Sequence, residues 1–158
     1  METLARKLIA RAAGQPVVSA GDVVICKVDL AMIHDSGGPR RVKPMLERLG
    51  RHVWDKDRVV VVTDHYVPAD TEETRAIQAL TRKWVRDEDI ANFYDQQGIC
   101  HVVLPERGHL SPGMFCVGVT AIRRPAVPSV PICSASGRPR WQGFWQLVKS
   151  GFVFPKPY

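Results

Sequence analysis

The sequence predicts an α/β fold with a mainly parallel sheet and helices on its faces, and three observations lead to this class. The run RVVVVTDH (58–65) is almost continuously β-branched, which is typical of a strand that is covered on both faces. Segments with apolar residues at helical spacing precede and follow this run. The resulting β-α-β-α-β order predicts parallel strands joined by helices that pack on the sheet.

The first elements follow from periodicity and from chain-breaking residues. Apolar residues at helical spacing predict a helix over residues 3–12, and the β-rich run DVVICKV predicts a strand over residues 22–28. The GGP sequence then breaks the chain. Pro39 suits the first turn of a helix that runs to Leu49, and Gly50 is expected to end it.

A longer helix is predicted after the valine-rich run. Asp70 is its expected N-cap, acidic residues occupy its first turn, and it runs to about Arg86. The residues expected to face inward are Ile77, Leu80, Trp84 and Val85. NFYD (92–95) is a possible short strand, and GMFCVG (113–118) has the composition of a buried strand.

Composition excludes some classes of protein. The chain has 158 residues, 45% of them apolar, which suffices for one domain or for part of a larger one. No apolar run approaches the ~18–20 residues of a membrane span, and the charged segment METLARKLIARAAG is a poor secretory signal. No C-x-x-C pair or disulfide framework is evident among Cys26, Cys100, Cys116 and Cys133. We therefore expect a cytoplasmic protein with free thiols and no membrane partner.

The charge is unevenly distributed. The chain carries a net charge of +6, yet residues 119–158 contain six basic residues and no acidic one. Residues 1–118 are therefore neutral and have no electrostatic footprint for nucleic acid. The tail is also rich in proline and keeps neither a helical nor a strand period, so we expect residues 119–158 to be irregular.

Polar side chains gather where the predicted strands end, which is where open α/β sheets place their chemistry. Asp29, His34 and Asp35 are expected after the first strand. Asp64 and His65 end the valine-rich run, where they could form either a turn or a functional pair.

His101 stands just before another apolar run, and by itself it fits a hydrogen-bonded core histidine better than a functional one. Its neighbour Cys100 could suggest a nucleophile and base. That hypothesis is disfavoured, because adjacent residues on a strand point to opposite faces.

Three strings together carry a family resemblance. They are AGDVVICKVDLAMIHDSGGP (20–39), VWDKDRVVVVTDHYVPADT (53–71) and FYDQQGICHVVLPERGHLSPGMFCVG (93–118). In order and spacing they resemble the aconitase superfamily, most closely the N-terminal part of the 3-isopropylmalate dehydratase large subunit. Homoaconitase and 2-methylmalate-type dehydratases are close behind.

The resemblance implies a hydro-lyase of leucine biosynthesis or a related pathway, which reversibly dehydrates a 2-hydroxy acid with the help of a small swivel-domain subunit. It also implies a 4Fe–4S cluster, with one iron acting as a Lewis acid. By position, Asp64 and His65 match a catalytic pair, His101 matches a second active-site histidine, and His34 and Asp35 match the substrate pocket. The 2-hydroxy acid stays open among 3-isopropylmalate, homoaconitate, citrate and methylated malates.

The family's cluster cysteines match no cysteine of this chain, so neither a cluster nor a metal is expected to bind it. The resemblance also stops at Gly118. The family continues there with Asp-Ser-His, whereas this chain continues VTAIRRPAVPS. If the reading frame is shifted by one base, the first two bases of the codons for Thr120, Ala121 and Ile122 become the last two bases of the new codons. These new codons can encode Asp, Ser and His. We expect residues 119–158 to be an out-of-frame tail and the chain to be a truncated, inactive form.

Two alternatives remain. A fragment of this kind could associate with an intact dehydratase subunit without catalysis. The basic tail with Trp141 and Trp145 could instead bind single-stranded nucleic acid. The second is disfavoured, because an out-of-frame, GC-rich coding sequence would produce the same basicity.

Overall fold

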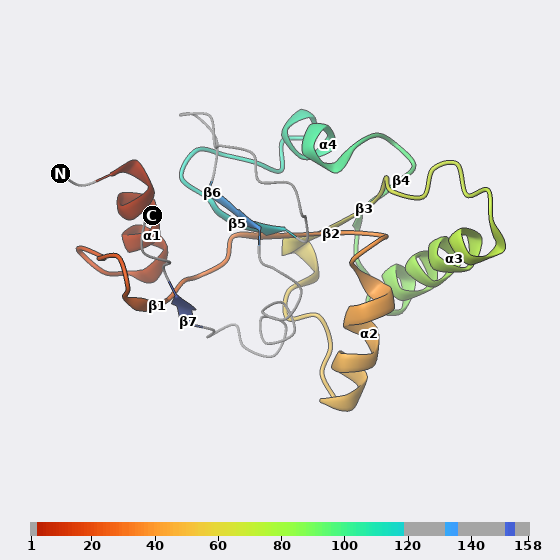
Figure 1. Ribbon diagram of the computed structural model, residues 1–158, viewed down its shortest axis with the longest axis horizontal. Helices are drawn as coiled ribbons and strands as arrows, with labels where there is room; N and C mark the ends of the chain where they lie inside the picture. The colour runs from red at the N-terminus through yellow and green to blue at the C-terminus, as the bar shows by residue number, and fades with distance from the viewer. Residues whose placement is uncertain (1–2, 119–131, 136–150, 154–158) are drawn as a thin grey trace.

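The computed structural model describes residues 3–118 and two short strands at 132–135 and 151–153 (Figure 1). Within these residues, a five-stranded sheet has the order β4-β3-β2-β5-β6, and each neighbouring pair is parallel. The strands in that order are Asn92–Asp95, Val59–Thr63, Leu30–His34, Phe115–Gly118 and Ile132–Ala135. The predicted α/β class and parallel sheet are therefore confirmed.

Helices cover both faces of this sheet. They are α1 (Leu4–Ala13), α2 (Pro39–Arg48), α3 (Glu72–Asp87) and α4 (Cys100–Glu106), and a 3-10 turn, η1 (Lys56–Arg58), leads into β3. Figure 1 shows α2 and α4 on opposite sides of the sheet. None of the helices within the described residues is long and apolar enough to cross a membrane.

The core is divided by the sheet into two apolar clusters. Ala31, Ile33 and Val61 pack with α1, α2 and α3, whereas Met32 and Val62 pack with α4. Alternate residues of β2 and β3 thus enter opposite clusters, as the pleat of a strand requires. This explains why the valine run is continuous: both faces of β3 are covered, and its four valines are buried, as is Thr63 at its end.

The first predicted strand is displaced in the structure. β1 spans only Val23–Ile25 and pairs antiparallel with β7 (Gly151–Val153), outside the main sheet. The central strand is instead β2, a segment that was expected to follow the first strand. Leu, Ala and Met have weak β propensity, so LAMIH gave no local strand signal, and its position is set by burial on both faces.

The helices α2 and α3 follow the predictions closely. α2 starts at Pro39 and ends at Arg48. For α3, the predicted N-cap Asp70 is wrong: Thr71 is the N-cap and forms a capping box with Thr74, since each hydroxyl accepts from the other's backbone N–H. The inward face is confirmed, with Leu80 half-buried and the rest buried, but it also includes two polar residues, Gln78 and Thr81.

The segment around His101 forms a helix, α4, and not a strand. Val103 and Leu104 face the core, whereas His101 and Val102 are exposed. In the tail, the described residues are those of β6 and β7. The other residues for which an irregular tail was predicted lie outside the described part of the chain. The alternative of a nucleic-acid surface around Trp141 and Trp145 also concerns residues outside that part.

Candidate active site

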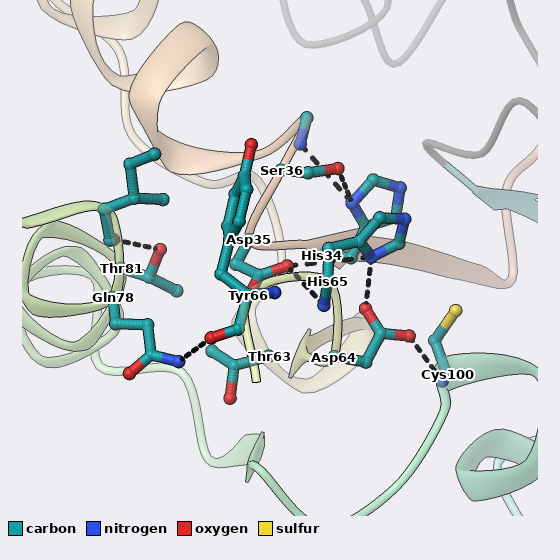
Figure 2. Close-up of polar contacts among 12 residues, drawn as sticks. His34, Asp35, Ser36, Thr63, Asp64, His65, Tyr66, Gln78, Thr81 and Cys100 are labelled. Atoms are coloured by element: carbon teal, nitrogen blue, oxygen red, sulfur yellow. Dashed lines mark hydrogen bonds and ion pairs between the residues drawn. The ribbon is translucent and has the colours of Figure 1, made fainter. Parts of the chain in front are cut away.

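The carboxyl ends of β2 and β3 bring four of the predicted site residues together. The strands are parallel with His34 opposite Val62, so Asp35 follows β2 beside the point where Asp64 and His65 follow β3. Potential ligand atoms of these four residues all lie within 4.8 Å of one another. Figure 2 shows the group, together with Tyr66 and Cys100.

Asp64 and His65 form the most direct polar contact. His65 Nδ1 lies 2.5 Å from Asp64 Oδ1, and the backbone N–H of Cys100 donates to Asp64 Oδ2 at 2.8 Å. Burial raises the pKa of Asp64, but the hydrogen bonds from Cys100 and His65 together lower it by a larger amount. The net pKa of Asp64 therefore lies below the ordinary value. The carboxylate is therefore ionised at neutral pH.

The ionised carboxylate fixes the orientation of the imidazole. A carboxylate can only accept, so Nδ1 of His65 must carry the proton that it shares with Asp64. The Asp64 side chain is 4% exposed, whereas that of His65 is 42% exposed. The pair therefore has a buried charge on one side and a solvent-accessible imidazole on the other.

Asp35 is turned toward the backbone of the same loop. It is completely buried, and its two oxygens accept from the backbone N–H groups of His65 and Tyr66, both at 3.2 Å. A buried carboxylate needs such donors. Asp35 thus links the end of β2 to the loop that carries the Asp64–His65 pair.

His34 stacks on His65, with ring centroids 4.0 Å apart and planes inclined by 20°. Its Nδ1 lies 3.3 Å from the N–H of Gly37 and 3.0 Å from the hydroxyl of Ser36. An N–H can only donate, so Nδ1 of His34 accepts, and the neutral ring carries its proton on Nε2.

The turn after His34 requires glycine. A Cβ atom on Gly38 would lie 2.2 Å from a methyl group of Ile33 and 2.4 Å from the carbonyl oxygen of His34. The chain can fold back over the strand end only without that atom, and α2 begins at the next residue, Pro39. The GGP sequence therefore places the start of a helix next to the stacked rings.

His101 is exposed in the first turn of α4, which excludes the alternative of a core histidine. It follows directly after Cys100, whose N–H binds Asp64. His101 is not one of the four residues whose ligand atoms converge. Its predicted role as a second active-site histidine stays a prediction.

Asp29 lies at the opposite edge of the sheet, so its predicted grouping with His34 and Asp35 is wrong. It precedes β2, and its carboxylate accepts from the N–H of Phe115 at 2.8 Å and lies 3.9 Å from Arg58. The correction follows from the displaced strand: five residues of β2 separate Asp29 from Asp35.

Sequence reasoning missed a polar network behind the loop. Gln78 of α3 donates to the Tyr66 carbonyl at 2.6 Å, and Thr63 donates to Asp95, which pairs with Arg82. The available signal was the pair of polar residues Gln78 and Thr81 on the inward face of an amphipathic helix, where apolar residues are expected.

The described cysteines do not suit an iron–sulfur cluster. Cys26, Cys100 and Cys116 are buried in the apolar clusters. Burial raises the pKa of Cys26. Burial, and to a smaller extent the hydrogen bond to Asp64, raises the pKa of Cys100 to about 12. Cluster ligands are thiolates, and these side chains behave as small apolar residues. The same protonated state argues against Cys100 as a nucleophile.

The four converging residues do not form a good site for a single metal ion either. A metal ion lies in the plane of the imidazole that binds it. The rings of His34 and His65 are stacked and inclined by only 20°, so their planes do not meet at a position where one ion could bind both rings. Both oxygens of Asp35 are also engaged by backbone N–H groups. The arrangement suits hydrogen bonding and proton transfer better than coordination.

Comparisons with known proteins give a consistent family relationship. No family model matches the chain. The 3-isopropylmalate dehydratase large subunit 1 of Methanopyrus kandleri is 42% identical over 118 residues, which is 74% of this chain and 28% of that protein. The probable 3-isopropylmalate dehydratase large subunit of Methanothermobacter thermautotrophicus is 43% identical over 117 residues, or 73% of this chain and 28% of that protein.

A probable methanogen homoaconitase large subunit, also from Methanothermobacter thermautotrophicus, is 42% identical over 120 residues, with 73% of this chain and 28% of that protein aligned. The chain thus spans 28% of the length of these curated relatives.

Proposed function

We propose that this chain, a relative of the 3-isopropylmalate dehydratase large subunits of the aconitase superfamily, forms with its described residues the proton-transfer side of the pocket of such a hydro-lyase. The reaction is the reversible removal of water from a 2-hydroxy acid. The observation that carries the proposal is the Asp64–His65 pair, in which a buried carboxylate orients a partly exposed imidazole.

In the proposed mechanism, His65 acts at the leaving hydroxyl. Asp64 holds Nδ1–H, so Nε2 is the atom that exchanges a proton with the substrate oxygen. When the C–O bond breaks, the protonated ring gives its Nε2 proton to the departing hydroxide, and water leaves. A separate base removes the proton of the adjacent carbon, and the electron pair of that C–H bond forms the C=C bond. In the reverse direction the neutral ring takes a proton from the attacking water. Asp64 stays ionised throughout and stabilises the imidazolium.

The other site residues have supporting roles in this proposal. His34 presents Nε2–H as a hydrogen-bond donor to a substrate carboxylate or hydroxyl, and its stacking limits the rotation of His65. Asp35 contributes to substrate binding indirectly, by holding the loop in place, because both of its oxygens already accept hydrogen bonds from that loop. His101 acts as a second acid or base from the exposed turn of α4.

The substrate proposed here is of the 3-isopropylmalate type, from the names of the relatives, and the proposed partner is a small dehydratase subunit. A homoaconitate-type substrate is the alternative. We further propose that the chain by itself lacks turnover, since the described cysteines offer no set of thiolates for a 4Fe–4S cluster.

Binding of the 2-hydroxy acid can be tested on the full chain by NMR titration with 3-isopropylmalate and with homoaconitate. We expect the imidazole signals of His34 and His65 to shift, and His65→Ala to weaken binding by about tenfold or more, the value of a hydrogen bond to a charged group. His52→Ala is the control, since His52 is exposed and contacts Glu88. Shifts at His52 without shifts at His65 would contradict the proposal.

A further inference from the structure

Gln78 connects the core of the protein to the loop that carries the Asp64–His65 pair. It lies on the inward face of α3 and is 3% exposed. Its Nε2 donates to the backbone carbonyl of Tyr66 at 2.6 Å, as Figure 2 shows. Tyr66 directly follows His65, so this hydrogen bond holds the carbonyl of the residue next to the one that carries the imidazole.

The orientation of the Gln78 amide is fixed by its other contacts. Its Oε1 accepts from Nε2 of Gln96 at 3.0 Å and from Nη2 of Arg82 at 3.3 Å. A guanidinium only donates, so the atom facing Arg82 must be the oxygen, and the atom facing Tyr66 must be the NH₂ group. Arg82 is in turn held by both oxygens of Asp95, at 2.6 and 3.2 Å.

Tyr66 is therefore held at both of its backbone polar groups. Its carbonyl accepts from Gln78 of α3, and its N–H donates to the buried Asp35 at the end of β2 at 3.2 Å. Two side chains from different elements thus fix one residue of the loop. The preceding N–H, of His65, is bound by Asp35 as well.

We propose that Gln78 is a positioning residue, which acts through the Tyr66 carbonyl to keep the His65 ring aligned with Asp64 and stacked on His34. The proposal rests on the proposed role of the Asp64–His65 pair. An apolar residue would fill this core position at lower desolvation cost, so a buried amide here is explained by the orientation that it gives to the loop.

Thr81 provides a matched control on the same face of α3. It is 1% exposed, and its hydroxyl donates to the carbonyl of Ile77 in its own helix at 2.9 Å. Thr81→Val removes a buried hydrogen bond of the same helix without touching the loop. It therefore reproduces a general loss of core stability, while the clamp on Tyr66 stays intact.

The experiment compares Gln78→Met, Gln78→Glu and Thr81→Val in the full chain. Amide hydrogen exchange at His65 and Tyr66 is measured relative to Val61 in β3, so that a global loss of stability cancels. Long-range imidazole NMR spectra report the Nδ1–H of His65. Gln78→Glu keeps an acceptor for Arg82 but faces the Tyr66 carbonyl with a carboxylate, so it tests the donor specifically.

We expect both Gln78 variants to accelerate relative exchange at His65 and Tyr66 by about tenfold, since local opening replaces a fixed loop. We also expect them to weaken the His65 Nδ1–H signal, and Thr81→Val to leave both readouts unchanged. Wild-type values in either folded Gln78 variant, or equal changes in Thr81→Val, would overturn the proposal. Because neither readout is turnover, the result does not depend on whether His65 proves catalytic in the substrate titration.

Discussion

The backbone N–H of Cys100 lies 2.8 Å from Oδ2 of Asp64, and this contact joins the start of α4 to the end of β3. The same carboxylate holds His65 with its other oxygen. One buried charge therefore fixes both the imidazole and the first turn of the helix that carries His101. The stability of the site and the position of two predicted active-site histidines depend on the same group.

Replacing Asp64 with Asn is expected to weaken both contacts. The charge-assisted hydrogen bonds become neutral ones, which should reduce the free energy of unfolding by about 1.5–3 kcal/mol. Chemical denaturation measures this loss, and the His65 Nδ1–H signal should weaken in parallel. Asp70→Asn, at an exposed position, should stay within about 0.5 kcal/mol of wild type. A similar loss in both variants would contradict the assignment.

Acid should destabilise the fold through Asp95 as well as Asp64. Burial raises the pKa of Asp95, but the hydrogen bonds from Arg82 and Thr63 lower it by more, so the net pKa lies below the ordinary value of an aspartate. A pKa lowered by folding contributes stability that is present above the unfolded pKa and lost as the pH falls through the folded value. The free energy of unfolding should therefore decrease as the pH is lowered below about 4, and this decrease should be smaller in Asp95→Asn. An unchanged pH dependence in Asp95→Asn would refute the linkage.

Alkaline pH should act through Cys100. Its pKa is raised from 9.0 to about 12, so its contribution to stability is complete below pH 9 and is lost as the pH rises toward 12. Cys100→Ala should reduce the slope of unfolding free energy between these values. Iodoacetamide at pH 8 should modify Cys100 slowly in the native chain and rapidly in urea. Rapid native modification would show that the thiol is neither buried nor protonated.

Gly38→Ala should distort the turn between β2 and α2. The added Cβ would meet the Ile33 side chain and the His34 carbonyl at 2.2 and 2.4 Å, and relieving such overlap costs about 1–3 kcal/mol or more. The His34 and His65 imidazole signals should shift in the same variant, because His34 must move. Gly50→Ala is the comparison, with open space around its Cβ but a left-handed backbone, φ +57°. We expect it to lower stability without altering the imidazoles.

The family resemblance ends at Gly118, and this abrupt end predicts a missing base in the coding DNA. We propose that one base is missing near the codon of Val119, so that the shifted frame spells Asp-Ser-His where this chain has Thr120, Ala121 and Ile122. Sequencing the gene around that codon tests this proposal directly. An alternative frame that does not spell Asp-Ser-His would exclude it.

Much of this arrangement could be predicted from local sequence. A run of four valines can be buried only between two layers, so RVVVVTDH determined a strand inside a parallel sheet, with Asp64 and His65 at its carboxyl end. Pro39 and the amphipathic pattern of α3 likewise determined two helices, because capping and periodicity are local properties.

The tertiary structure decided what depends on contacts between distant residues. LAMIH became the central strand because both of its faces are covered, although its residues do not favour a strand locally. That shift moved Asp29 to the opposite edge of the sheet. Gln78 and Tyr66 lie 12 positions apart, and their hydrogen bond exists only once α3 packs against the loop that follows β3. Local propensity places residues on elements, whereas the pairing of buried polar groups depends on how those elements pack.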